Sequence, residues 1–198
     1  MGRRRFHLVS AVLLVLSVLM SLALVVPATA AGDRVLVYVG NSGVNHGYTW
    51  LGSAVSQPVD TLYVLPADLS SYSCVVLSTP RTVMSSEAKA ALETYVTGGG
   101  TILAIGELAD STMTFYNPTI TTLNDLATSL DSDVTLQAAV VDFDLYTTTN
   151  IDASPLTAGV DSIAYGATSL VNVAANGTGQ SLVRTVGGST FIGVDRIG

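Results

Sequence analysis

Cysteine is almost absent from this sequence of 198 residues. Cys74 is the only one, so no intramolecular disulfide can form and packing has to stabilise the fold. It begins the apolar run Cys74-Val75-Val76-Leu77, which favours a buried and inert thiol. A reactive thiolate would need an electropositive, partly exposed setting.

Basic residues are also scarce. Residues 1–30 hold three of the eight lysines and arginines and none of the fifteen acidic residues, so the remainder has five basic residues and a net charge of −10. Binding to a phosphate backbone needs a cluster of basic side chains, whereas these five are scattered along the sequence. Nucleic acid is therefore excluded as a partner, and the negative charge favours solubility.

Residues 1–30 have the pattern of a signal peptide. Arg3-Arg4-Arg5 precede an apolar run over 8–26, and the small residues of Pro27-Ala28-Thr29-Ala30 suit signal peptidase. We expect a mature chain of residues 31–198 outside the cytoplasm, whether secreted, periplasmic or at the cell surface. The arginines fit both ordinary Sec export and the twin-arginine route. The membrane is a partner only if this segment stays uncleaved, since its length of about nineteen residues just suffices to cross a bilayer.

Apolar strands and helices alternate through the first part of the mature chain. Strands are expected over 34–39, 61–65, 74–77 and 101–105, and an irregular helix is expected up to about 56. Such alternation predicts a parallel sheet with right-handed crossovers in one domain.

The clearest helix lies between Ser85 and the glycines at 98–100. Ser85 is a natural N-cap, and Glu87 suits the positive end of the helix dipole. The triple glycine predicts a left-handed cap, after which residues 101–105 form a buried strand. The apolar stripe has helical spacing and consists of Ala88, Ala91, Leu92, Tyr95 and Val96.

After Gly106 the pattern becomes richer in strands. A helix over 119–130 and a long strand over 134–145 are expected first. Residues 155–160 resemble a turn, and short antiparallel strands are expected over 169–174, 180–186 and 190–194. The expected fold class is α/β, with a mostly parallel central sheet and a β-rich C-terminal portion.

Three segments carry a resemblance to a known family. They are Leu69-Ser70-Ser71-Tyr72, the stretch from Ser85 to Thr101, and Ser154-Pro155-Leu156-Thr157-Ala158-Gly159-Val160. In this order they resemble the class I glutamine amidotransferase-like superfamily, especially its non-amidotransferase members in secreted and surface proteins. The resemblance spans nearly all of residues 31–198 and implies a flavodoxin-like three-layer sandwich. Members usually continue past a segment such as 191–198, so it also implies a truncated domain or a piece of a longer protein.

The chemistry of active members is missing from the matching positions. In those members the fourth strand runs into a tight elbow, G-x-C-x-G, whose cysteine is the nucleophile. This chain has Gly106-Glu107-Leu108-Ala109 there, and its only mature histidine is His46 rather than a late one. We therefore assign no catalytic residue, no metal ligand set and no cofactor.

Three residues remain as candidates for binding a ligand. Glu107 follows the fourth strand, and Asn45 and His46 follow the first, so all three open on the carboxyl edge of the sheet, where open α/β sheets bind ligands. Surface loop positions are the simpler interpretation, and these candidates are too few to specify a metal site.

Asp142 and Asp144 form an acidic pair on one face of the strand expected over 134–145. Calcium needs more oxygen ligands than this pair supplies, so a solvent-facing strand edge fits better. Asn176-Gly177-Thr178 also fits the N-glycosylation pattern.

Two functions remain. The first is an exported, non-catalytic binding or structural module of a cell-surface or secreted protein, with a glycan or another surface protein as partner. The alternative is an extracellular hydrolase, directed at glycans or peptides, in which carboxylates such as Glu107 or Asp142 replace the missing cysteine. The empty elbow and the missing late histidine favour the first.

Overall fold

The structure is a computed structural model that describes residues 32–40, 51–106, 117–140, 144–166 and 169–197. The chain divides into two compact units, Met1–Ala30 and Ala31–Gly198, and all described residues belong to the second. Within these described ranges, no helix has the length and apolar character needed to cross a membrane.

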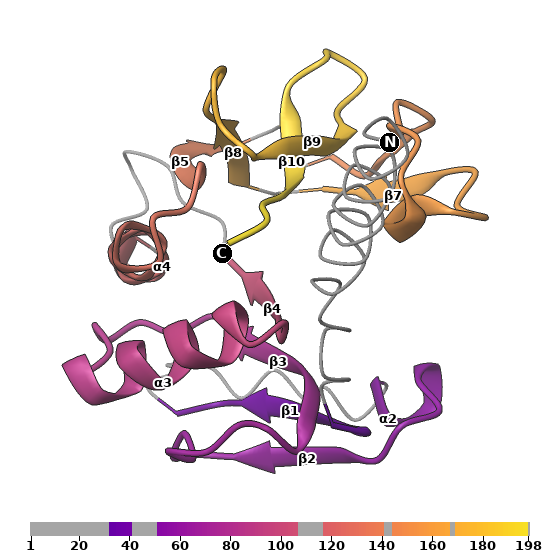
Figure 1. Ribbon diagram of the computed structural model, residues 1–198. Helices are drawn as coiled ribbons and strands as arrows, with labels where there is room; N and C mark the ends of the chain where they lie inside the picture. Colours follow the sequence, from indigo (N-terminus) through magenta and orange to yellow (C-terminus); the bar gives the residue numbers. More distant parts are fainter. Residues whose placement is uncertain (1–31, 41–50, 107–116, 141–143, 167–168, 198) are drawn as a thin grey trace, which may run out of the picture. The chain divides into compact units, whose positions relative to one another are not determined.

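A parallel sheet forms the first part of the second unit (Figure 1). Its strands are β1 (Arg34–Tyr38), β2 (Val59–Leu62), β3 (Tyr72–Ser78) and β4 (Thr101–Ile105), in the order β2-β1-β3-β4. At the centre, Val37 of β1 lies opposite Thr61 on one side and Val76 on the other. The predicted α/β class with a parallel sheet is confirmed.

Apolar side chains cover both faces of β1, as its continuous apolar run predicts. On one face, Leu36 packs in a cluster with Leu92 of α3 (Ser86–Thr97) and Leu123 of α4 (Asn117–Ser129). On the other face, Val37 belongs to a smaller cluster against which Val55 packs, next to the short helix α2 (Leu51–Ala54). Alternate residues of one strand thus enter two separate cores.

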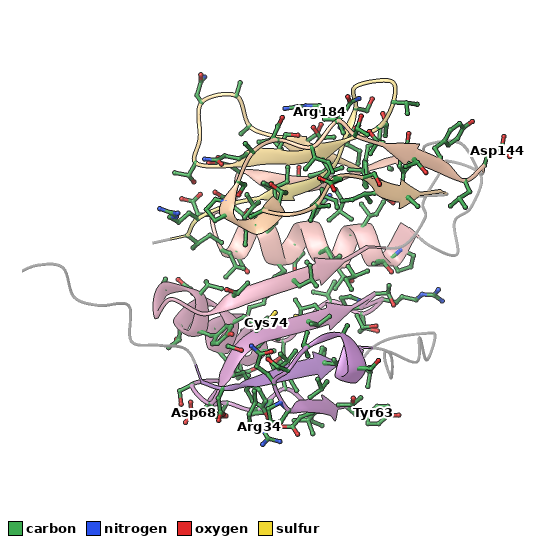
Figure 2. All side chains as sticks on the ribbon, turned by 90° about the vertical axis from the view of Figure 1, so that its right-hand side faces the viewer. Arg34, Tyr63, Asp68, Cys74, Asp144 and Arg184 are labelled. Atoms are coloured by element: carbon green, nitrogen blue, oxygen red, sulfur yellow. The ribbon has the colours of Figure 1, made fainter. Side chains whose placement is uncertain are left out.

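Two strands of the parallel sheet differ from their predictions. β2 ends at Leu62, and the side chain of Tyr63 that follows is 70% exposed and points away from the sheet (Figure 2). The strand over 101–105 has the predicted bounds, but it is not buried, since Leu103 is 49% exposed. Among the described residues β4 pairs with β3 alone, so it is an edge strand. Sequence hydrophobicity alone does not distinguish an apolar edge strand from a central one.

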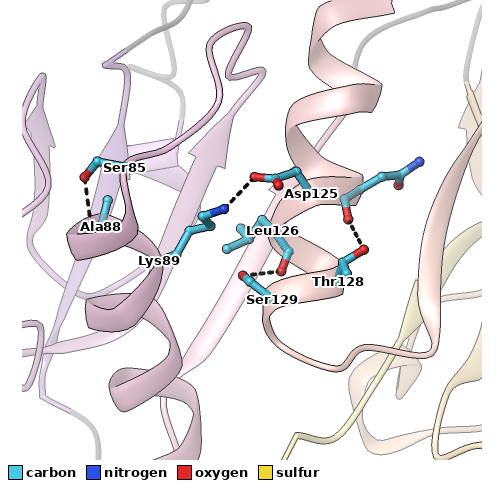
Figure 3. Close-up of polar contacts among 8 residues, drawn as sticks. Ser85, Ala88, Lys89, Asp125, Leu126, Thr128 and Ser129 are labelled. Atoms are coloured by element: carbon cyan, nitrogen blue, oxygen red, sulfur yellow. Dashed lines mark hydrogen bonds and ion pairs between the residues drawn. The ribbon is translucent and has the colours of Figure 1, made fainter.

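α3 begins and ends as the sequence predicts. The Ser85 hydroxyl oxygen accepts a hydrogen bond of 3.2 Å from the backbone N–H of Ala88 (Figure 3). At the other end Gly99 has a φ of +94°, and the Gly100 N–H donates to the carbonyl oxygen of Tyr95 at 2.9 Å. Leu92 and Tyr95 are the buried residues of the helix.

The second part of the unit consists of α4 and antiparallel strand pairs. A 3-10 turn at Pro155–Thr157 lies between β6 and β7. The pairs are β5 (Val134–Val140) with β8 (Ser169–Val173), β6 (Tyr146–Thr148) with β7 (Ile163–Tyr165), and β9 (Gln180–Arg184) with β10 (Thr190–Val194). The predicted β-rich C-terminal portion is confirmed.

The strand predicted over 134–145 begins at the predicted residue but is shorter than predicted. β5 ends at Val140, which pairs with Ser169, the first residue of β8, so the partner strand extends no further. Asp144 lies in a bend and Leu145 is 81% exposed. Asp142, the other member of the predicted acidic pair, lies outside the described residues.

Candidate functional site: the carboxyl edge of the parallel sheet

The order of the strands marks one edge of the sheet as the candidate site. The chain leaves β1 for β2 on one side and then crosses to β3 on the other side. In open α/β sheets, ligands bind beyond the carboxyl ends of the strands at such a reversal. Here those ends are Gly40 after β1, Ser78 of β3 and, next to it, Gly106 after β4.

Ser78 has a buried hydroxyl group without a partner. The residue is 1% exposed, and its Oγ makes no hydrogen bond within the described residues. Leaving a buried polar group unpaired costs about 1–3 kcal/mol, so a fold retains one only where other interactions compensate. An unpaired buried hydroxyl in a native fold calls for an explanation, and a functional role is one of those known for such groups.

Thr79, the next residue, has an unusual backbone. Its φ is +43°, a left-handed value that is costly for a β-branched residue. Two features hold it: the residue is buried, and its N–H donates to the carbonyl oxygen of Ile105 at 3.1 Å. Strained residues that the surrounding structure fixes in this way concentrate at functional sites.

The two glycines at this edge are closely surrounded. A Cβ atom built on Gly40 would overlap the carbonyl oxygen of Tyr63, and one built on Gly106 would overlap the side chain of Leu136. Neither position accepts a side chain without movement of its neighbours. At Gly40 the clash is with backbone, so glycine is required there for steric reasons independently of any ligand, whereas at Gly106 the end of the flexible Leu136 side chain could shift.

The predicted ligand-binding residues Glu107, His46 and Asn45 lie outside the described residues. The strands that precede them, β4 and β1, both end at the carboxyl edge. The expectation that all three open on this edge stays a prediction. In the part of the chain that the structure describes, no group of three or more His, Cys, Asp or Glu residues is placed to hold a metal ion.

Cys74 lies within β3, opposite Val35 and Thr101 in the neighbouring strands (Figure 2). It is half-buried, and this burial raises the pKa of its thiol, which a hydrogen bond with the backbone of Leu103 lowers in part. The neutral thiol is therefore favoured, in keeping with the predicted inert cysteine. Its position is in the strand rather than at an elbow.

The sequence did not point to Ser78 and Thr79, which directly follow the strand expected over 74–77. A φ angle and an unpaired hydroxyl are properties of the folded chain. The sequence feature that could have indicated this site is the pair of hydroxyl residues between an apolar strand and Pro80.

No protein-family model and no curated protein matches the chain. Among solved structures, one described as "mmIFT52 N-terminal domain" is similar with a TM-score of 0.57 and 14% sequence identity. The match covers 75% of this chain and 71% of that one. At this identity the likeness bears on the α/β fold alone, and the amidotransferase-like resemblance stays a prediction.

Proposed function

We propose that this chain is an exported, non-catalytic domain of the glutamine amidotransferase-like type, which binds a glycan or another surface protein at the carboxyl edge of its parallel sheet. The observation that carries the proposal is the buried, unpartnered hydroxyl of Ser78 beside the left-handed Thr79. Both lie where the strand order reverses, which is the place where this sheet architecture accommodates ligands.

The flavodoxin-like layering is part of this proposal. Its support is that both faces of the sheet carry a core, one formed with α3 and α4 and one that includes Val55 beside α2. A sheet with apolar clusters on both faces is what a three-layer arrangement requires.

The absence of catalysis rests on the residues at the strand ends. The elbow sequence Gly106-Glu107-Leu108-Ala109 lacks a nucleophile, and Cys74 lies inside a strand with a raised thiol pKa. Export rests on the signal-like pattern of residues 1–30, and the net charge of −10 that remains favours neutral or basic partners over acidic ones.

Ser78→Ala separates a binding role from a structural one. The change removes an unpaired buried hydroxyl, so the urea midpoint of unfolding should stay the same or rise. Binding to a panel of extracellular glycans and surface proteins should weaken by up to about tenfold, the value of one hydrogen bond. Ser73→Ala is the matched control, because the Ser73 hydroxyl already donates to the carbonyl oxygen of Arg34 at 3.0 Å. Equal binding by wild type and Ser78→Ala would count against the proposed edge.

Glu107→Gln tests the hydrolase alternative. Neither the wild type nor this variant should release product from glycan or peptide substrates, because the elbow lacks a nucleophile. Glu93→Gln is the matched control, since Glu93 is an exposed carboxylate within α3, away from the strand ends. Turnover by the wild type that persists in Glu93→Gln and disappears in Glu107→Gln would overturn the non-catalytic proposal.

A further inference from the structure

A polar cluster ties together three segments of the β-rich part. The carboxylate of Asp195, after β10, accepts hydrogen bonds from the Ser132 hydroxyl at 2.9 Å and from the Asp133 N–H at 2.6 Å, both just before β5. It also accepts one from the Thr178 hydroxyl at 2.6 Å, in the turn between β8 and β9. The Thr178 N–H donates to the Asp133 carboxylate at 2.6 Å. We call Ser132, Asp133, Thr178 and Asp195 the Asp195 cluster.

Asn176 and Gly177 lie in the same turn, directly before Thr178. Asn176 is exposed, and neither its side-chain amide nor the backbone N–H of Gly177 makes a hydrogen bond within the described residues. Other described asparagines differ. Asn124 uses both atoms of its amide on the backbone of Leu136, and Asn150 donates to the carbonyl oxygen of Thr185 at 2.9 Å.

We propose that Asn176 is a site of spontaneous deamidation, and that the product loosens the Asp195 cluster. The Gly177 nitrogen attacks Cγ of Asn176, a new C–N bond closes a succinimide ring, and the Cγ–Nδ2 bond breaks. The side-chain nitrogen leaves as ammonia with the proton from Gly177. Water then opens the ring to aspartate or isoaspartate. Because Gly177 has no side chain of its own, none stands between its nitrogen and Cγ of Asn176.

The modification acts on the cluster through charge and through backbone length. Gly177 lies directly against the Asp133 carboxylate, where a Cβ atom would overlap it, so the new carboxylate forms on the residue next to this contact. Among the described residues, neither Asp133 nor Asp195 forms a salt bridge with a lysine or arginine. Like charges without a counter-ion repel. The isoaspartate form also adds a carbon to the main chain and shifts Thr178 from its two partners.

The test follows the full chain, produced in a host without N-glycosylation, during incubation in mildly alkaline buffer. Peptide mapping should show Asn176 converting to aspartate and isoaspartate, with the mass gain of an amide-to-acid change, well ahead of Asn124, Asn150 and Asn172. Asn176→Gln should suppress the new acidic form that ion exchange separates. Conversion of Asn176 no faster than that of the other three would overturn the proposed site.

The consequence is measured on the modified fraction itself. Once separated by ion exchange, it should unfold at a lower urea concentration than fresh protein, and the Thr178 amide should exchange its hydrogen faster. An unchanged midpoint and unchanged exchange would overturn the loosening of the cluster. Gly177→Ala is unsuitable as a control, because the added Cβ atom disturbs Asp133 without any deamidation.

Discussion

The parallel sheet depends mainly on an apolar core, whereas the β-rich part combines buried apolar residues such as Val183 with many side-chain hydrogen bonds. In the sheet, the fully buried residues Leu36, Leu77 and Leu92 form one apolar core between strands and helices. In the β-rich part, side chains form hydrogen bonds with the backbone of neighbouring segments. The Thr148 hydroxyl donates to the carbonyl oxygen of Arg184 at 2.8 Å, and the Asn150 side-chain amide donates to the carbonyl oxygen of Thr185. Isolated pairs of short strands are marginally stable in water, so they need such additional ties.

The comparison implies that the two parts respond differently to mutation. In an apolar core, the loss of stability grows with the side-chain volume that a substitution removes. In a polar network, removing one member destabilises the fold because its hydrogen-bond partners stay buried and unpaired. Both parts should respond to pH: in the β-rich part through Asp195, and in the sheet through Asp60, whose pKa is lowered by its hydrogen bond with Arg34.

Leu36→Ala should have the largest effect, because it leaves a cavity between β1 and the helices. We expect a loss of about 2–5 kcal/mol in the free energy of unfolding, measured by urea denaturation. Leu156→Ala is the control, since Leu156 is exposed in the β-rich part and should change stability by less than about 0.5 kcal/mol. Similar losses for both variants would contradict the apolar core described for the sheet.

Asp195→Ala should have the next largest effect, about 1–3 kcal/mol, because it leaves the donors of Ser132 and Thr178 without their acceptor. Amide hydrogen exchange should rise in β5 and β10 and stay unchanged in β1 and β3. Faster exchange throughout the chain would show that the two parts unfold as one unit.

The same carboxylate predicts a dependence on pH. Burial alone raises the pKa of Asp195, but hydrogen bonds from Thr178, Asp133, Ser132 and Arg196 outweigh it, and the net pKa is lowered. The stabilisation is therefore complete above the unfolded pKa of about 3.9 and is lost as the pH falls through the lower folded value. In Asp195→Asn, the free energy of unfolding should fall less steeply as the pH is lowered through this range, the acid limb of the stability curve. An identical acid limb in wild type and variant would exclude Asp195 as its source.

Ser85→Ala should cost about 1 kcal/mol, because the first turn of α3 loses its N-cap acceptor (Figure 3). Thermal unfolding of the variant beside Ser85→Asp, which restores an acceptor, checks the cause. Equal destabilisation by both substitutions would rule out capping as the role of Ser85.

The ion pair between Lys89 of α3 and Asp125 of α4 should have the smallest effect. Its nitrogen and oxygen are 2.9 Å apart, and both side chains are partly exposed (Figure 3). A double-mutant cycle with Lys89→Met and Asp125→Asn should give a coupling of about 0.2–1 kcal/mol that declines with added salt. A larger coupling that salt leaves unchanged would place the pair in a more buried setting.

Sequence patterns predicted the elements whose signals are local. The Ser85 cap, the left-handed glycine after α3 and the bounds of β4 and β10 follow from residue types within one turn or strand. The failures depend on partners far along the chain. β5 ends where β8 begins, and β4 is exposed because of its place in the sheet, neither of which a local pattern contains.

The candidate site likewise has one part that the sequence predicted and another that it did not. The carboxyl edge followed from the expected parallel strands, and the order β2-β1-β3-β4 adds the reversal next to β1. Ser78 and Thr79 became candidates only through burial and backbone geometry, which tertiary packing imposes on residues of ordinary type. Glu107, His46 and Asn45 stay sequence predictions.

Mapping a bound glycan by amide chemical shifts tests the central claim most directly. The account predicts that a binding glycan from the panel perturbs the N–H signals of Val39, Gly40, Thr79 and Gly106, which surround the carboxyl edge, and leaves the β-rich part unchanged. Shifts confined to β8, β9 and β10, with none at Thr79, would contradict it and move the binding function to the other part of the molecule.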